Sequence, residues 1–384
     1  MEKTLILFLM LFSLPLWAVK DGKYRLELAT QYAKIPFQLE FKNKGKEAII
    51  LNGDEHIKLK NLGSKKKNHL SLEIPPYQIQ LSLDFSADNV SGFLVKSNGS
   101  QLPVKGTLND TLFESTKRKP ENFHGKWEVT DGKGEKNVLL LEQNHGQIKG
   151  SYLTPYGDYR YFNGRIDGPK FEASSFDGVY NYLITGELKG DKLEAQILAN
   201  YKIELQGKRN PQAKLPDPYK LTQMNKKLDF KFPDLDGKTV ALKDPEFRNK
   251  PVIVQIFGSW CPNCIDELKY LIPWYEKNQK RGIRIIALSF ERTQDLKRTQ
   301  MVLKKLAREY GLNYPMLIAG LNSEDTPENK LPGLKNFKAF PTTIYLDKQH
   351  NVFKVHAGFN GPSTKEFYEE WQTEFNLTID QLLK

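Results

Sequence analysis

The first half of the chain alternates apolar and polar residues with a period of two. Between residues 19 and 208, short alternating runs are separated by Gly, Asn, Asp and Lys, and helical periodicity is scarce. This pattern predicts β-strands that each bury one face. The clearest runs place apolar side chains at Tyr24, Leu26 and Leu28, at Ile79, Leu81, Leu83 and Phe85, and at Leu193, Ala195 and Ile197.

A short motif, apolar-x-Gly-x-apolar, recurs at irregular spacing in this half. Because a glycine inside a strand commonly marks a bulge or bend, the motif favours a curved meander, a sandwich or a small barrel over a solenoid. The polar stretch 117–122 predicts two β-rich regions, residues 19–118 and 119–208. The motif occurs at Val104-Lys-Gly-Thr-Leu108, Ile148-Lys-Gly-Ser-Tyr152, Phe162-Asn-Gly-Arg-Ile166 and Ile184-Thr-Gly-Glu-Leu188.

The pattern changes after a proline-rich segment. Residues 209–225 carry prolines with little periodicity and predict a stiff linker. From 226 to 384, strands alternate with helical patterns, which predicts an α/β domain behind the all-β region. The expected elements are strands at 252–257, 283–290, 342–346 and 352–356, the last two as a hairpin, and helices from about 262, across 294–311, and after a cap at Ser363 or Thr364.

The N-terminus predicts export. Lys3 precedes an apolar stretch, and small Ala18 offers a cleavage point, so residues 1–18 read as a signal peptide and the mature protein as periplasmic or otherwise exported. The stretch is shorter than the ~20 residues of a spanning helix, although an uncleaved membrane anchor stays open as an alternative. Lipid attachment at the cleavage site is excluded because both cysteines lie beyond residue 260.

The net charge of +11 raises the question of nucleic acid or anionic surfaces. The excess is spread over both halves of the chain, and its densest cluster, residues 65–67, has no interleaved aromatic residues for base stacking. We therefore expect a solvated loop there and no nucleic-acid partner.

Two cysteines in the segment Trp260-Cys261-Pro262-Asn263-Cys264 carry the candidate chemistry. The segment joins a β-branched strand to a helix, where a C-x-x-C pair is typical of redox chemistry. Cys261 in the first helical turn meets unpaired backbone N–H groups and the positive end of the helix dipole, which favour its thiolate. Cys261 is therefore the expected nucleophile, and Cys264 is expected to resolve the mixed disulfide.

A structural disulfide and a zinc site are weaker interpretations of this cysteine pair. A structural disulfide closing four residues gains only about 2 kcal/mol on the chain-entropy model. A zinc site lacks further cysteines, and none of the six histidines is near in sequence. We expect neither a metal nor another cofactor, because the electrons reside on two sulfurs and the sequence has no dinucleotide fingerprint.

The C-terminal part, from about residue 226, resembles the TlpA/ResA-type thiol-disulfide oxidoreductases of the thioredoxin superfamily. The resemblance rests on the C-x-x-C segment, on Phe232 to Val240 as an extra N-terminal hairpin, and on Ala339-Phe-Pro-Thr-Thr-Ile-Tyr-Leu-Asp347. It implies a cis peptide bond at Pro341, with the backbone of Phe340 pairing with an extended substrate segment. A peroxiredoxin-like enzyme is disfavoured because Phe257-Gly-Ser-Trp260 lacks the threonine that precedes the reactive cysteine in that class.

The same resemblance suggests an acid near the second cysteine. The strand position that holds an aspartate in thioredoxin is Gln255 here, whereas the TlpA/ResA pattern has a glutamate three residues after the second cysteine, which is Glu267. Burial would raise its pKa toward that of a useful base, and the alternative is an ordinary solvated glutamate. The neighbouring Asp266 is expected to be solvated.

The residues around the pair have supporting roles. Trp260 is expected to pack beside the pair and contribute to substrate binding with Phe340 and Pro341. Pro262 pre-sets the first helical turn, and with Asn263 it is expected to tune the redox potential.

The motif and the export signal favour a protein-disulfide reductase. The resemblance implies that a membrane electron donor keeps it reduced, with cytochrome c maturation as one destination, and envelope association is a further expectation. A disulfide-forming oxidase would use the same residues. A different class of function remains open, in which the β-rich region binds a ligand or envelope partner and the redox domain is accessory.

Overall fold

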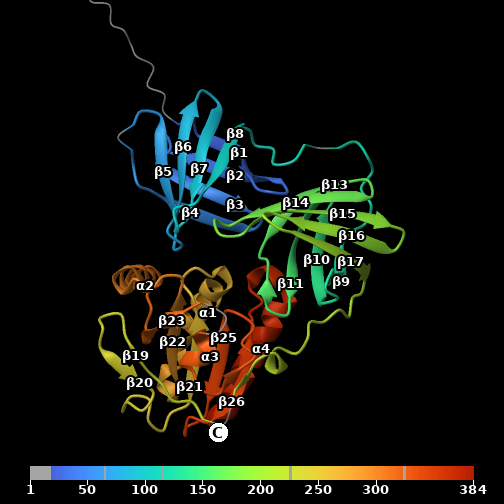
Figure 1. The fold of residues 1–384 in the computed structure, drawn as a ribbon. Helices are drawn as coiled ribbons and strands as arrows, with labels where there is room; N and C mark the ends of the chain where they lie inside the picture. The colour runs from blue at the N-terminus through green and yellow to red at the C-terminus, as the bar shows by residue number, and fades with distance from the viewer. Residues whose placement is uncertain (1–18, 65, 115, 225–226, 323–325) are drawn as a thin grey trace, which may run out of the picture.

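The computed structural model describes residues 19–384 except 65, 115, 225–226 and 323–325. The predicted signal segment 1–18 and Lys65 of the basic cluster therefore lie outside the described residues. Three parts follow one another along the chain, two β-barrels and a C-terminal α/β domain (Figure 1). The predicted fold class, an all-β region followed by an α/β domain, is confirmed.

The first barrel consists of eight antiparallel strands in chain order, closed by pairing of its first and last strands. Alternate side chains such as Tyr24, Leu26 and Leu28 are fully buried inside it, as the period-two pattern predicted. Its strands are β1 (Gly22–Ala29), β2 (Lys34–Lys42), β3 (Glu47–Asn52), β4 (Glu55–Asn61), β5 (His69–Ile74), β6 (Ile79–Ser86), β7 (Asn89–Val95) and β8 (Gln101–Leu108).

The second barrel is a nine-stranded antiparallel sheet that also closes on itself, because β10 pairs with both β9 and β11. The repeated glycines allow its strands to lie close together: a Cβ on Gly164 would come within 1.9 Å of the Glu172 carbonyl oxygen on the next strand. Its strands are β9 (Gly125–Asp131), β10 (Lys136–Asn144), β11 (Gln147–Thr154), β12 (Gly157–Asp158), β13 (Phe162–Asp167), β14 (Lys170–Phe176), β15 (Asn181–Lys189), β16 (Lys192–Leu198) and β17 (Lys202–Arg209).

The C-terminal domain is built on a five-stranded sheet in the order β23-β22-β21-β25-β26. The strands are β21 (Val252–Phe257), β22 (Arg284–Glu291), β23 (Met316–Leu321), β25 (Thr342–Leu346) and β26 (Val352–Ala357). The first three are parallel, whereas β25 runs antiparallel to β21 and forms the predicted hairpin with β26. Every residue of β21 is buried, as expected for a central strand covered on both faces.

Helices α1 (Pro262–Asn278), α2 (Leu296–Tyr310) and α4 (Glu366–Leu383) pack on one face of this sheet. The expected hairpin of β19 (Lys231–Pro233) and β20 (Thr239–Ala241) is present. The short helix α3 (Thr326–Lys330) and the two-residue strands β18 (Gln223–Met224) and β24 (Leu334–Lys335) were not predicted. Three-residue 3-10 segments lie at Pro218–Lys220, Gln279–Arg281 and Pro362–Thr364.

One helix start was predicted wrongly. Neither Ser363 nor Thr364 caps α4, whose N-cap is Lys365, and no side chain caps it. The Ser363 hydroxyl instead donates to Asp158 in the second barrel at 2.9 Å, and that of Thr364 donates to the Gly361 carbonyl. The Ser363 hydroxyl is therefore used in a contact between domains and not as a helix cap.

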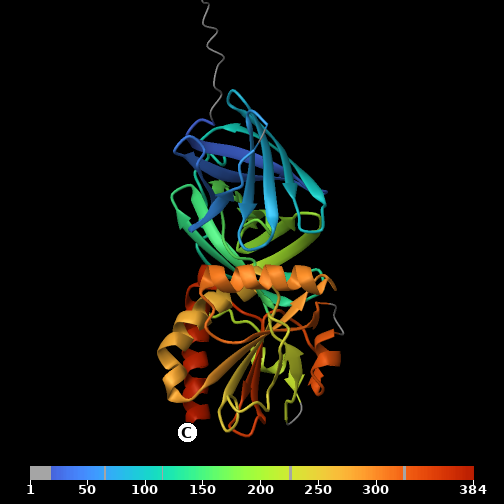
Figure 2. The ribbon, with the colours of Figure 1, turned by 90° about the vertical axis from the view of Figure 1, so that its left-hand side faces the viewer.

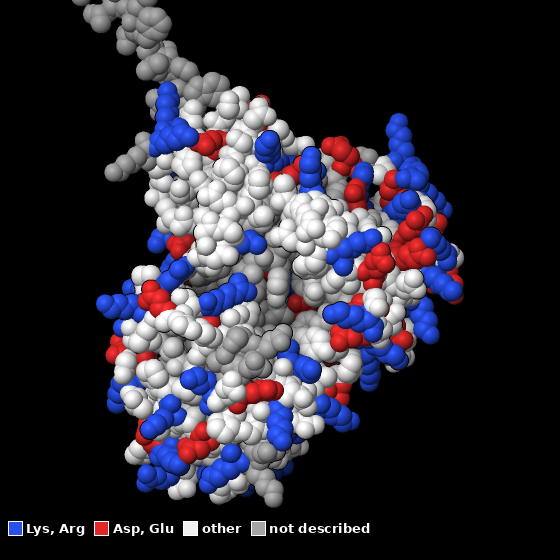
Figure 3. Space-filling model, in the orientation of Figure 1, with Lys and Arg blue, Asp and Glu red and all other residues white. Residues whose placement is uncertain are grey.

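The barrels lie over the C-terminal ends of the parallel strands and the start of α1, with α2 crossing beneath them (Figure 2). On the face shown in Figure 3, basic and acidic side chains are interspersed, and the surface is hollowed where the β-barrels meet the C-terminal domain. Among the described residues, no helix is long and apolar enough to cross a membrane.

Candidate redox site

Cys261 and Cys264 lie where β21 ends and α1 begins, as the sequence predicted. They form a disulfide with their Cα atoms 5.3 Å apart. Cys261 is the N-cap residue of α1, and its Sγ accepts the backbone N–H of Cys264 at 3.2 Å. Pro262 occupies the first helical position, where the missing N–H costs nothing. The N-terminal end of the helix therefore offers a hydrogen bond and a favourable dipole to a Cys261 thiolate.

The segment before β25 lies against this disulfide. Antiparallel pairing of β25 with β21 brings Phe340 beside the cysteines, and the Phe340 carbonyl oxygen is 3.6 Å from the Cys261 Sγ. The Phe340–Pro341 peptide bond is cis, as the resemblance implied. Pro341 is buried and Phe340 partly exposed, so the backbone next to the sulfur lies near the protein surface.

Trp260 forms the other side of the site. Its Nε1 donates to the Phe290 carbonyl oxygen at 2.9 Å, which fixes the indole. The ring meets Phe340 edge-on with centroids 5.2 Å apart, and the Arg292 guanidinium lies 4.4 Å from its centroid. Trp260 and Phe340 thus form an aromatic rim beside Cys261, and the sulfur of Cys261 is nearly covered, since the residue is only 3% exposed.

Glu267 is fully buried beneath the cysteines, one helical turn after Cys264. Its two carboxylate oxygens accept hydrogen bonds from the Thr343 hydroxyl and the Gln255 side-chain amide, both at 2.7 Å. Burial raises the pKa of Glu267 to about 7, and these two hydrogen bonds lower it only in part. Glu267 is therefore a buried acid, as the family resemblance suggested, and the solvated alternative is wrong.

Thr343 is a partner that the sequence reasoning did not name. Thr343 and Tyr345 alternate along β25, and Thr343 pairs with Gln255 across the sheet. Gln255 and Thr343 are polar residues opposite each other in two central strands. Because buried polar groups need partners, this pair could have indicated a polar contact with Glu267.

Comparisons with known proteins match the C-terminal domain. A model of the AhpC/TSA family matches residues 224–355. The thiol-disulfide oxidoreductase ResA of Bacillus thuringiensis subsp. konkukian is 30% identical over 143 residues, which cover 37% of this chain and 72% of that protein. ResA of Halalkalibacterium halodurans is 26% identical over 145 residues, 38% of this chain and 72% of that protein.

The chain belongs to the ResA family of thiol-disulfide oxidoreductases. The resemblance drawn from the motifs is confirmed, and the C-terminal domain is thioredoxin-like. A solved thiol:disulfide interchange protein from Chlorobium tepidum TLS is 19% identical, with a TM-score of 0.32, over 42% of this chain and 97% of that chain.

The second barrel, which lies outside this ResA match, contacts the cysteine helix directly. Asn263, between the two cysteines, is 4% exposed and donates through Nδ2 to the carbonyl oxygens of Asp158 and Phe359 at 3.0 and 3.2 Å. Gly157 lies so close that a Cβ there would be 2.8 Å from the Asn263 amide nitrogen. The expected redox-tuning residue Asn263 is thus also a contact between domains.

Asp266 corrects a prediction, because it is 9% exposed rather than solvated. Its carboxylate pairs with the guanidinium of Arg160, on the loop after β12, and this arginine also pairs with Glu55 of the first barrel and with Asp177, 2.9 Å away. One buried arginine therefore joins both barrels to the cysteine helix. Sequence spacing does not indicate this contact, since Arg160 and Asp266 are 106 positions apart.

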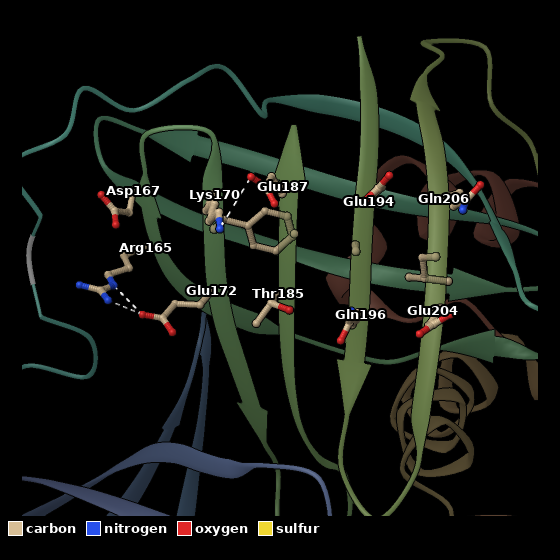
Figure 4. A pocket seen from close by; sticks show the side chains of 14 residues that line it. Arg165, Asp167, Lys170, Glu172, Thr185, Glu187, Glu194, Gln196, Glu204 and Gln206 are labelled. Carbon is tan, nitrogen blue, oxygen red and sulfur yellow. Dashed lines mark hydrogen bonds and ion pairs between the residues drawn. The ribbon is translucent and has the colours of Figure 1, made fainter. Parts of the chain in front are cut away.

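Two hollows differ in their relation to the site. A pocket of about 320 Å³ lies between the end of the second barrel and the cysteines, and includes Asn263 and Phe340 in its lining. A hollow of about 550 Å³ on the polar face of β13 to β17 has no residue in common with the redox site, and its charges partly neutralise one another, as between Arg165 and Glu172 (Figure 4). Among the described residues, no cluster of His, Cys, Asp and Glu is arranged to hold a metal ion.

Proposed function

We propose that this protein is an exported reductase of protein disulfides. The observation that carries the proposal is the placement of the Cys261–Cys264 pair at the N-terminus of α1 with the buried, high-pKa Glu267 one turn further along. This arrangement favours a nucleophilic thiolate on the first cysteine and supplies a proton acceptor for the second.

The reaction starts from the dithiol form. The Cys261 thiolate attacks one sulfur of the substrate disulfide, which forms a mixed disulfide and releases the first substrate thiolate. The Cys264 thiolate then attacks Cys261, releases the second substrate thiolate and closes the internal disulfide. Two electrons pass from the protein sulfurs to the substrate sulfurs, so no further cofactor is required.

Glu267 acts on the second step. Its pKa near 7 matches a group that accepts the Cys264 proton at neutral pH, because general bases work best near the operating pH. Thr343 and Gln255 hold the carboxylate in place through both of its oxygens.

Substrate binds along the backbone before Pro341. An extended segment adds as a strand beside Phe340, whose carbonyl oxygen already lies 3.6 Å from the nucleophilic sulfur. Trp260 and Phe340 provide apolar contact. Pro262 and Asn263 influence the potential through the first turn of the helix.

Export, a membrane electron donor and a destination in cytochrome c maturation belong to the same proposal. Export is supported by the signal-like segment 1–18. A reductase outside the cytoplasm needs such a donor, because each turnover leaves its cysteines oxidised.

The reduction potential of the pair decides between a reductase and an oxidase. It is measured by equilibration in glutathione or dithiothreitol buffers, followed by thiol alkylation. A value near about −270 mV supports reduction, and a value near about −120 mV makes the protein a disulfide-forming oxidant and contradicts the proposal. Dithiol-dependent reduction of a protein disulfide is expected in the wild type and absent in Cys261→Ser.

A further inference from the structure

The pocket between the second barrel and the cysteines, called here the interdomain pocket, has a specific chemistry. Twelve of its fourteen lining residues come from the second barrel, and the other two, Asn263 and Phe340, belong to the redox site. A substrate segment that binds beside Phe340 would therefore lie at the edge of this pocket. Its volume of about 320 Å³ lies within the range of small-ligand sites, about 300–1,000 Å³.

The charges of the interdomain pocket are mostly negative. Asp131, Glu135 and Asp158 face a single basic residue, Lys133, among the lining residues. The Asp158 carboxylate is already used at the domain interface, where it accepts the Gly361 N–H at 2.6 Å. Asp131 and Glu135 are only partly buried. Asp131 Oδ1 accepts two backbone N–H groups and Glu135 Oε1 accepts the Tyr156 hydroxyl at 3.1 Å, which leaves the second oxygen of each carboxylate for a ligand.

Two buried amides of this pocket lack a hydrogen-bond donor. Asn137 and Asn263 are 2% and 4% exposed, and the Oδ1 atom of each is buried without a partner among the described residues. The orientation of each amide is fixed, because Nδ2 of Asn137 donates to the Glu135 carbonyl oxygen at 3.2 Å and Nδ2 of Asn263 donates to two carbonyl oxygens. A buried acceptor without a donor is costly, so both sites favour a ligand that carries N–H groups.

The aromatic walls suit the same kind of ligand. Tyr159 stacks on Tyr180 with ring centroids 6.2 Å apart and meets Tyr152 edge-on at 5.0 Å. Tyrosine faces attract cations. The carboxylates, the unpaired amide oxygens and the tyrosine rings of this pocket thus all favour the same kind of ligand, a cation with N–H donors.

We propose that the interdomain pocket binds a lysine or arginine side chain of the substrate polypeptide, close to the cysteine whose disulfide is reduced. This inference rests on the proposed reductase function and adds a specificity that the thioredoxin-like domain alone would not supply. Asp131 and Glu135 are specificity-determining residues in it, and they take no part in the thiol chemistry.

The test uses disulfide-linked dimers of short peptides that differ only at the two positions on either side of the cysteine, which hold Lys, Leu or Glu. The full-length protein, kept reduced by dithiothreitol, is assayed for the kcat/KM of each dimer at low ionic strength, after subtraction of the rate with dithiothreitol alone. We expect the Lys dimer to be reduced about tenfold more efficiently than the Glu dimer, mainly through KM.

The decisive variant is Asp131→Asn combined with Glu135→Gln. Asparagine keeps the Oδ1 atom that accepts the Lys133 and Glu135 N–H groups, so the turn is conserved. The preference for Lys over Glu should fall to about twofold or less. Glu194→Gln combined with Glu204→Gln removes the same charge from the polar face of β16 and β17 and should leave the preference unchanged.

The outcomes separate the two proposals. If the wild type reduces none of the dimers, the reductase function itself fails. If it reduces all of them with equal efficiency, or if the preference survives Asp131→Asn with Glu135→Gln, the reductase stands and the cationic pocket is overturned. An equal loss with the control pair would assign the preference to overall charge and would also overturn the pocket.

Discussion

Replacement of Glu267 by glutamine should remove a pH dependence of stability that burial of this carboxyl creates. The pKa of Glu267 is raised from 4.5 to about 7 in the folded protein, chiefly by burial. Between these values the folded state binds more protons than the unfolded state, so the unfolding free energy of the wild type falls as pH rises through this window. The loss is complete above pH 7, and below pH 4.5 both states hold the proton.

The magnitude follows from the shift. A difference of about 2.5 pKa units corresponds to about 3 kcal/mol, since one unit is about 1.4 kcal/mol. Glutamine does not titrate and fits the site, because the Gln255 Oε1 has no partner among the described residues and can accept its amide after rotation of the Gln255 side chain. Buried groups such as Asp177, whose pKa burial raises to about 6, are shared by both proteins and cancel in the comparison.

The assay is urea unfolding of the disulfide form, followed by tryptophan fluorescence between pH 4 and pH 8. Three of the five tryptophans, Trp260, Trp274 and Trp371, lie in the C-terminal domain. The unfolding free energy of the wild type should fall by about 3 kcal/mol more than that of Glu267→Gln across this range. Parallel curves for the two proteins would refute the raised pKa and with it the role of Glu267 as a base near neutrality.

Three further changes test other parts of the structure. Cys264→Ser should accumulate the mixed disulfide with substrate on Cys261, seen as a mass increase that reductant removes, whereas Cys261→Ser should accumulate none. Arg160→Met should lower the unfolding free energy by about 3–5 kcal/mol because it leaves buried carboxylates unpaired. Arg118→Met, at an exposed pair with Asp167, should leave the unfolding free energy nearly unchanged. Gly164→Ala should lower the unfolding free energy by about 1–3 kcal/mol in the same urea assay, because the added Cβ meets the Glu172 carbonyl oxygen. Gly146→Ala is the control, because a Cβ there has nothing within 4 Å, and it should leave the unfolding free energy nearly unchanged.

The redox site could be predicted because its residues lie close together in the sequence or match a known family. A β-branched strand, a C-x-x-C pair and a glutamate one turn later occupy sixteen consecutive positions from 252 to 267. Helical spacing alone then puts Glu267 near Cys264, but it does not settle burial, since the neighbouring Asp266 was expected to be solvated and is only 9% exposed. Pro341 needed the family resemblance, because nothing in its immediate sequence distinguishes a cis bond from a trans one.

The barrels could be predicted only as β-structure. Alternation fixes which side chains of a strand are buried, but it does not say which distant strand pairs with it. Closure of the first barrel depends on pairing of Tyr24 with Leu108, and that of the second on pairing of β10 with β11. The glycines signalled curvature correctly, yet curvature is shared by sandwiches and barrels, so the choice between them required the structure.

The contacts between domains also change how the β-rich region must be understood. A redox domain that is merely accessory to a binding function of the β-rich region would not need contacts at its cysteine helix, but here Asn263 and Asp266, both in the first five residues of α1, contact the segment 157–160, which is β12 and the loop after it. Ser363, which precedes α4, contacts the same segment through Asp158. Movement of the second barrel would therefore break the hydrogen bond between Asn263 and Asp158 and unpair the buried carboxylate of Asp266, one position before Glu267. The second barrel is a structural part of the redox site, and an effect of this barrel on substrate access should appear in kcat/KM.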